Sequence, residues 1–177
     1  MTDNAPQELI PEWAALSGPA AQLLADLRAS GVRVITAESC TGGLLAAALT
    51  HFSGSSESVE GGFVTYSNTM KQAVLGVQAQ TLKHYGAVSS QTVHEMAEGA
   101  LRVATLATLS IAISGIAGPG GARPDKPVGL VWFGTALRGG QTRADSRIFT
   151  GSRASVRSQA VEHALSLLAQ RLAEYGR

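Results

Sequence analysis

The chain has 177 residues, of which 45% are hydrophobic and 15% charged, and its formal net charge at pH 7 is +1. This composition is typical of one globular domain with a sizeable core, and it excludes a disordered chain. The near-neutral charge argues against binding to nucleic acid or to an anionic membrane surface. The single cysteine excludes an internal disulfide and a cysteine-based metal site, and it fits a reducing cytoplasm.

The first 16 residues are polar and acidic, which predicts an N-terminal arm followed by one domain over residues 17–177. The sequence shows neither a signal peptide nor an apolar run long enough to cross a membrane. We therefore expect a cytoplasmic protein without membrane contact.

Apolar residues recur at helical spacing over 17–30, and Gly31 is placed to end that predicted helix. An apolar strand is predicted over 32–37, and a helix from Leu44 to about residue 52. A second strand is predicted over 62–67, where β-forming residues follow two glycines.

Asn68 is predicted to cap a short helix that carries Lys71, and a brief helix follows near 79–84. Ser89 or Ser90 is predicted to cap a longer helix. The next segment, 109–114, is almost entirely apolar, as expected for a strand buried on both faces.

Two further strands, 128–137 and 142–150, flank a glycine-containing turn and predict a β-hairpin. A long C-terminal helix follows residues 151–152. Strands that alternate with helices and end in a hairpin predict an α/β fold: a three-layer α/β/α sandwich with a mixed, mostly parallel sheet.

Three polar or glycine-rich segments follow the predicted strands: 38–43, 66–71 and 114–121. In open α/β sheets, ligands bind beyond the carboxyl ends of the strands. We therefore expect these segments to meet at one edge of the sheet and to form a site there.

The first segment combines Ser39 with a helix start, where free N–H groups could stabilise an oxyanion. Ser39 is a candidate nucleophile, but Ser39 or Thr41 could equally be a simple helix cap. Cys40 is a rival nucleophile, because a helix N-terminus lowers the pKa of a thiol. The alternative for Cys40 is a small residue that packs beneath the turn.

A nucleophilic serine needs a base, and none of the four histidines follows a predicted strand. We expect surface or packing roles for His51, His84, His94 and His163, and no metal site. Lys71 lies five residues after Tyr66, and burial would lower its pKa enough for it to accept the proton of Ser39. Tyr66 could relay that proton or hydrogen-bond the pair. The alternatives are a solvated lysine and an ordinary strand aromatic.

The glycine-rich segment 115–121 could cradle a phosphate or a second oxyanion with its N–H groups, or it could be a simple loop. It matches neither a Walker loop nor a dinucleotide-binding loop. Residues 138–177 hold seven arginines against three acidic residues. This excess indicates either a solvated helix face or one or two arginines that meet an anionic ligand.

Six ordered motifs resemble the CinA C-terminal domain family: TAESCTGG (36–43), GGFVTYSNTMK (61–71), GAVS (86–89), ISGIAGPGG (113–121), KPVGLVWFG (126–134) and FTGSR…VR (149–157). The resemblance covers residues 20–172. Members of this family are similar to nicotinamide mononucleotide (NMN) amidohydrolases of the PncC type. The resemblance implies a stand-alone member that converts NMN and water to nicotinate mononucleotide and ammonia in pyridine-nucleotide salvage.

The resemblance implies Ser39 as the nucleophile, Lys71 as the base and Tyr66 as its helper, with neither a metal nor an organic cofactor. One departure is Ser152, where the family more often has an acidic residue. The phosphate of the substrate is expected at the helix start over 41–43, at the 115–121 loop or at Arg153. The substrate-binding residues expected in these segments are Glu38, Cys40, Thr41, Gly42, Gly43, Ser114, Gly115, Ile116, Ala117, Gly118 and Arg153.

Two other functions remain open on the sequence. One is a non-catalytic nucleotide-binding or regulatory module linked to competence or the DNA damage response. The other is an amidase for a different small amide. The high alanine content and the apolar helix faces favour a homo-oligomer.

Overall fold

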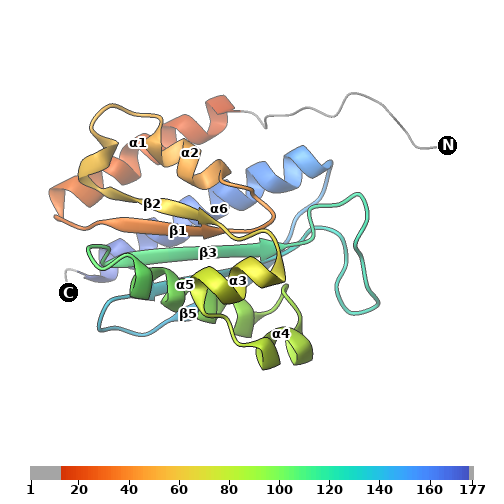
Figure 1. Cartoon of the computed structure of the whole chain (residues 1–177). Coiled ribbons are helices and arrows are strands. Elements are labelled where there is room, and N and C mark those ends of the chain that lie inside the picture. Colours follow the sequence, from red (N-terminus) through yellow and green to blue (C-terminus); the bar gives the residue numbers. More distant parts are fainter. Residues whose placement is uncertain (1–12, 176–177) are drawn as a thin grey trace.

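A five-stranded mixed sheet forms the centre of the protein in the computed structural model, which describes residues 13–175 (Figure 1). In spatial order its strands are β2 (Val59–Val64), β1 (Val34–Glu38), β3 (Leu109–Gly115), β4 (Leu130–Leu137) and β5 (Arg143–Ile148). The strands β2, β1 and β3 are parallel, whereas β4 runs antiparallel to both β3 and β5. Both β1 and β3 are buried along almost their whole length, as the apolar sequences predict.

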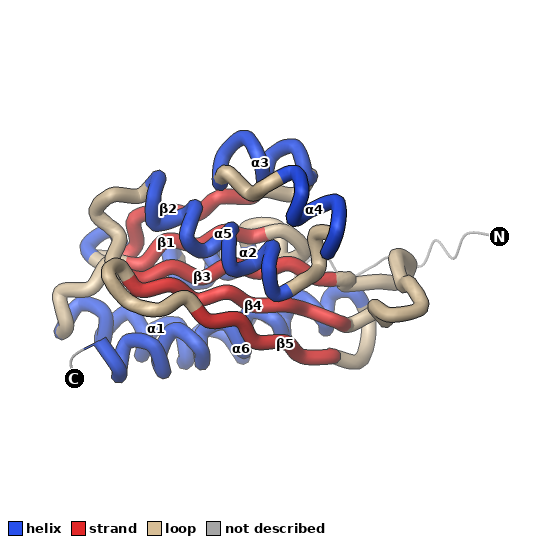
Figure 2. The backbone as a smooth tube through the Cα atoms, turned by 90° about the horizontal axis from the view of Figure 1, so that it is seen from below, coloured by secondary structure: helices blue, strands red, loops and turns tan. Residues whose placement is uncertain are grey.

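Helices cover both faces of the sheet, which confirms the predicted three-layer α/β/α fold (Figure 2). One face carries α1 (Trp13–Ala29), α2 (Leu44–Thr50) and α6 (Arg153–Tyr175); the other carries α3 (Asn68–Leu75), α4 (Ala79–Tyr85) and α5 (Ser90–Val103). A short 3₁₀ helix, Ser55–Glu57, precedes β2. A separate cluster of buried apolar side chains fills the space on each side of the sheet. Within residues 13–175, no helix is long and apolar enough to cross a membrane.

The second strand differs from the prediction, because β2 begins at Val59 and ends at Val64 rather than covering 62–67. Helix α2 packs directly over this strand. A Cβ atom at Gly62 would lie 2.5 Å from Thr36 Oγ1 and 2.7 Å from the Cβ of Ala46. The two glycines near the predicted start of this strand, Gly61 and Gly62, therefore lie inside it. At Gly62 the close approach of α2 leaves no room for a side chain.

The first helix also begins earlier than predicted, at Trp13 instead of residue 17. Leu16 belongs to this helix and is buried in the core, so residues 13–16 are part of the domain. The rest of the predicted arm, residues 1–12, lies outside the described residues.

Serine side chains cap two helices on the α5 side of the sheet. Ser67 caps α3 by accepting a hydrogen bond from the N–H of Met70, so the prediction of Asn68 as the cap was wrong by one residue. Ser89 caps α5 by accepting from the N–H of Thr92, which decides between the two serines left open by the sequence.

Helix α5 approaches the end of α3 so closely that its position 99 must be a glycine. A Cβ atom at Gly99 would lie 2.0 Å from the carbonyl oxygen of Leu75.

Alanine is favoured over glycine in a free helix by about 1 kcal/mol. We nevertheless expect Gly99→Ala to lower the free energy of unfolding by about 1–3 kcal/mol, because the added methyl group overpacks the contact. Urea denaturation measures this, and Gln91→Ala on the exposed face of α5 is the control, expected within about 0.5 kcal/mol of the parent.

Candidate active site

The carboxyl ends of β1, β2 and β3 meet at one edge of the sheet, as predicted from the positions of the polar segments (Figure 1). In the strand register Glu38 lies opposite both Val64 of β2 and Ile113 of β3. The N–H of Ser39 donates to the carbonyl of Ile113 at 2.9 Å, and the N–H of Thr65 donates to the carbonyl of Glu38 at 2.8 Å. The three strand exits are therefore joined by backbone hydrogen bonds.

Ser39 and Lys71 form a buried pair at this edge. The distance from Lys71 Nζ to Ser39 Oγ is 2.9 Å, although 32 residues separate the two in sequence. Lys71 is only 1% exposed and Ser39 is 8% exposed. The amino group also donates to the backbone carbonyls of Thr65 at 2.8 Å and Tyr66 at 3.3 Å. Lys71 is therefore a buried side chain and not the solvated surface lysine that the sequence left open.

Burial lowers the pKa of Lys71 from 10.5 to about 8, because a charged ammonium is poorly solvated there. The three acceptors match the three N–H bonds of the charged form. After loss of one proton, two N–H bonds still satisfy the carbonyls of Thr65 and Tyr66, and the lone pair faces Ser39 Oγ. This arrangement can accept the serine proton and return it.

Cys40 does not have the properties of a nucleophile. Its side chain is buried in the core, and burial raises the pKa of the thiol to about 12. The thiol therefore stays protonated at neutral pH, and the packing role is the one that the structure supports.

Glu38 is placed differently from the predicted substrate-binding role. The carboxylate is completely buried and accepts hydrogen bonds from the N–H groups of Gly43, Leu45 and Ala46. The carboxylate therefore takes the place at the start of α2 where an external anion could otherwise bind. The sequence left this helix start open as one of three candidate phosphate sites, but N–H groups there already have an anionic partner.

The turn from Thr41 to Gly43 shapes the backbone that follows Ser39. Gly42 and Gly43 have φ angles of +63° and +93°, which a residue with a side chain adopts only with strain. Thr41 is fully buried. The N–H groups of Cys40 and Thr41 donate to no carbonyl of another described residue. These two N–H groups follow Ser39 directly in the chain.

Tyr66 is held by an arginine from α6. The side chain of Tyr66 is 62% exposed, and its hydroxyl accepts a hydrogen bond from Arg153 at 3.2 Å. Arg153 also donates to the carbonyl of Gly118 at 3.0 Å. Tyr66 hydrogen-bonds Lys71 through its backbone carbonyl, whereas its hydroxyl is bonded to Arg153.

Most of the segment 114–118 supports the structure and does not face the site. Ser114 is buried and donates to the carbonyl of Ala87, and Ala117 lies in the core. The N–H of Ile116 donates to Leu130, and Gly115 packs against β4 so closely that a Cβ would lie 2.7 Å from a methyl of Val131. Gly118 reaches the site through its carbonyl, which accepts from Arg153.

Arg157 is a site residue that the sequence motifs contained but to which we assigned no role. It lies one turn after Arg153 on α6 and donates to the carbonyl of Thr41 at 2.9 Å. The sequence signal that could have indicated it is the spacing of four residues from Arg153, which places both arginines on the same face of a helix. Ser152 accepts a hydrogen bond from the N–H of Ser155 and so caps this helix.

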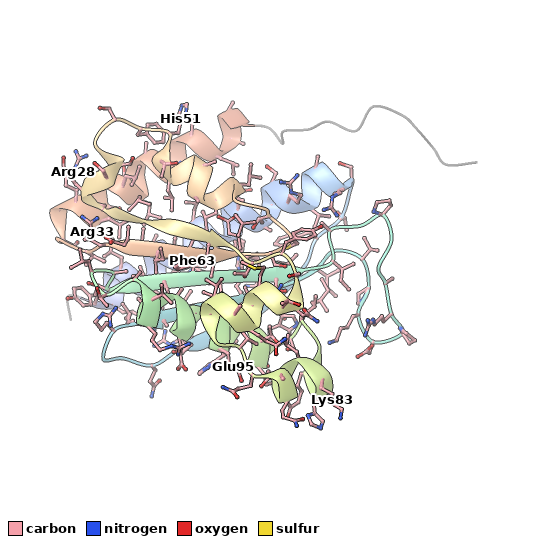
Figure 3. The ribbon with its side chains drawn as sticks, viewed as in Figure 1. Arg28, Arg33, His51, Phe63, Lys83 and Glu95 are labelled. Atoms are coloured by element: carbon pink, nitrogen blue, oxygen red, sulfur yellow. The ribbon has the colours of Figure 1, made fainter. Side chains whose placement is uncertain are left out.

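The histidines have the surface and packing roles that we predicted. His51 follows α2 at the end remote from Ser39 (Figure 3). His84 lies in the last turn of α4. His163 packs on Phe133 and is hydrogen-bonded to Asp145. No group of three or more His, Cys, Asp or Glu residues within 13–175 could hold a metal ion.

Comparison with known proteins places these motifs in one family. Residues 17–172 match the family model described as the CinA C-terminal domain. The nicotinamide-nucleotide amidohydrolase PncC of Enterobacter agglomerans is 51% identical over 141 residues, which cover 80% of this chain and 85% of that protein. The protein of the same name from Escherichia coli K12 is 49% identical over 144 residues, which cover 81% and 87% of the two chains.

Among solved structures, the competence/damage inducible protein CihA from Agrobacterium tumefaciens matches with a TM-score of 0.85. It is 43% identical, and the match covers 93% of this chain and 98% of that one. The likeness therefore extends over both layers of helices as well as the sheet.

The Ser39–Lys71 pair predicts pH-dependent reactivity toward a fluorophosphonate, which reacts with activated serines. We expect the adduct on Ser39, formed at a rate that rises with pH with a midpoint of about 8, as Lys71 loses its proton. Lys71→Met should slow labelling by about 100-fold or more, because the general base is removed. Mass spectrometry of the intact and digested protein measures this.

The matched control is Ser114→Ala, which removes a buried serine that is bonded elsewhere and should label like the parent. Labelling at Cys40, or a labelling rate independent of pH between 6 and 9, would contradict the assignment.

Proposed function

The chain belongs to the CinA C-terminal domain family, and we propose that it hydrolyses the carboxamide of NMN to give nicotinate mononucleotide and ammonia. The observation that carries the proposal is the buried contact of 2.9 Å between Lys71 Nζ and Ser39 Oγ. Relatives about half identical over most of their length are named nicotinamide-nucleotide amidohydrolases, and this contact supplies a nucleophile and a base for that reaction.

In the first half of the reaction, neutral Lys71 accepts the proton of Ser39 while Oγ attacks the carboxamide carbon. The positive pyridinium ring withdraws electrons from that carbon and so favours attack. The N–H groups of Cys40 and Thr41 are available to stabilise the oxyanion that forms. When the tetrahedral intermediate collapses, Lys71 returns the proton to the nitrogen, and ammonia leaves.

The second half repeats the same proton transfers with water. Lys71 accepts a proton from a water molecule that attacks the ester between Ser39 and the nicotinoyl group. Collapse of the second intermediate releases nicotinate mononucleotide, and Lys71 returns the proton to Ser39 Oγ. Each proton taken by Lys71 is given back, so the pair is regenerated after one turnover.

The phosphate of NMN is best accommodated at the start of α6. Arg153 and Arg157 both reach the strand exits from this helix, and neither forms a salt bridge with a described carboxylate. The two guanidinium groups therefore leave positive charge near Ser39 that an anion can neutralise. The α2 start is a poorer choice, because Glu38 occupies it.

Tyr66 is suited to the other charged part of the substrate. Its ring is exposed beside the catalytic pair, and Arg153 holds its hydroxyl. Aromatic faces attract cations, and a pyridinium ring is a flat cation of matching size. We assign Tyr66 to stacking against this ring, with the phosphate on the side of Arg153.

The cellular setting follows from the same proposal. Hydrolysis of NMN places the protein in pyridine-nucleotide salvage in the cytoplasm, where the single thiol of Cys40 stays reduced. A homo-oligomer and the absence of nucleic-acid and membrane partners remain predictions from the sequence.

The direct test is ammonia release from NMN by the purified protein, with and without a chelator. We expect release that the chelator does not change, and none above background from Ser39→Ala that folds normally. Nicotinamide should be a much poorer substrate, because it lacks the ribose phosphate that contributes binding energy to the transition state. Tight NMN binding without ammonia release would contradict the proposal and favour a regulatory module.

The phosphate assignment predicts a substrate-dependent effect of Arg153→Met. We expect KM for NMN to rise by about 10- to 100-fold, as for loss of a hydrogen bond to a charged group. The kcat/KM for nicotinamide riboside, which lacks the phosphate, should change by less than about 3-fold, since the lost contact is to the phosphate. Arg143→Met, at the start of β5 and so at the opposite edge of the sheet from the site, is the control and should leave both substrates unaffected. Equal losses on both substrates would contradict the assignment.

A further inference from the structure

Glu38 brings a carboxylate into the interior beside Ser39. It is the last residue of β1, and its side chain is fully buried. Its oxygens accept hydrogen bonds from the N–H groups of Gly43 at 3.0 Å, Leu45 at 3.1 Å and Ala46 at 2.8 Å. Thr36 Oγ1, at 3.2 Å, completes the set. Four donors therefore hold this carboxylate, and no described cation forms a salt bridge with it.

These bonds close the turn that carries Ser39. The carboxylate connects the end of β1 to the start of α2, so residues 39–42 span two points that are fixed to each other. The backbone of Glu38 also reaches the base. Its carbonyl accepts from the N–H of Thr65, and the carbonyl of Thr65 in turn accepts from Lys71 Nζ. One residue is thus connected to both members of the catalytic pair.

We propose that Glu38 is a positioning residue for the reaction, and that it acts through its carboxylate. The carboxylate fixes the β1–α2 turn so that Ser39 Oγ remains in contact with Lys71 Nζ. The effect on turnover rests on the proposed hydrolysis of NMN, whereas the effect on the position of Ser39 concerns the reactivity of that serine itself.

Two variants of Glu38 test this by chemical rescue. In Glu38→Ala the carboxylate is missing and leaves a space beside the free N–H groups. In Glu38→Gln the space stays filled, but an NH₂ group replaces one acceptor oxygen. We expect kcat per folded molecule to fall by about 100-fold in both, with KM for NMN within about 3-fold of the parent, because a small displacement of the nucleophile affects the chemistry more than binding.

Sodium formate supplies a small carboxylate of the right shape. It should raise kcat of Glu38→Ala by about 10-fold or more, since it restores the acceptor for the N–H groups. Formamide should have no effect, and neither should formate on Glu38→Gln, whose side chain fills the space. Glu60→Ala removes a carboxylate at the opposite end of β2, where it pairs with Arg33, and should show no formate effect.

The fluorophosphonate labelling rate of Ser39 separates this proposal from the proposed function. If the parent releases no ammonia from NMN, the proposed function fails, but the labelling rate must still fall in both variants and recover with formate in Glu38→Ala. If Glu38→Ala does not fold, the isosteric Glu38→Gln carries the labelling test alone. Parent-like kcat and labelling per folded molecule, with only a lowered Tm, would overturn the positioning role.

Discussion

The amino group of Lys71 is buried at the edge of the sheet with almost no access to water, and the geometry of the site depends on the atoms that accept its hydrogen bonds. Two of its three acceptors are consecutive backbone carbonyls, those of Thr65 and Tyr66. Ser67 then caps α3, so the chain enters a helix directly after these two residues. The first turn of that helix brings the Lys71 side chain back to the carboxyl end of β2. The third acceptor is Ser39 Oγ. Burial thus lowers the pKa of the lysine and leaves the serine as the partner for its lone pair.

The interior beside this edge contains a second charge, and the two charges are kept apart. Glu38 is neutralised by N–H groups of α2, while Lys71 is held by carbonyls and a hydroxyl. A salt bridge between them would favour the charged lysine and raise its pKa. A protonated lysine cannot accept the serine proton. The separate partners therefore allow one fold to hold a buried carboxylate and a lysine of lowered pKa at the same edge of the sheet.

The same edge offers complementary features to a substrate with charges at both ends. Tyr66 presents an exposed ring, and Arg153 and Arg157 present guanidinium groups that form no salt bridge within residues 13–175. These residues come from the exit of β2 and from the start of α6, which are far apart in sequence. Arg153 connects them by bonding both Tyr66 and the carbonyl of Gly118. An anion bound to Arg153 would therefore also affect the position of the ring.

The sequence by itself determined the layers, the apolar strands and the three polar segments at one edge, because hydrophobic period and glycine positions depend on local physics. It also indicated Ser39 and Lys71. It could not place Glu38, whose carboxylate was expected to face the substrate, because a helix N-terminus attracts an internal anion as readily as an external one. It also missed Arg157 and the carbonyl of Thr65. Only the tertiary structure decided these points, since burial, backbone acceptors and the partner of each charge arise from contacts between segments distant in sequence.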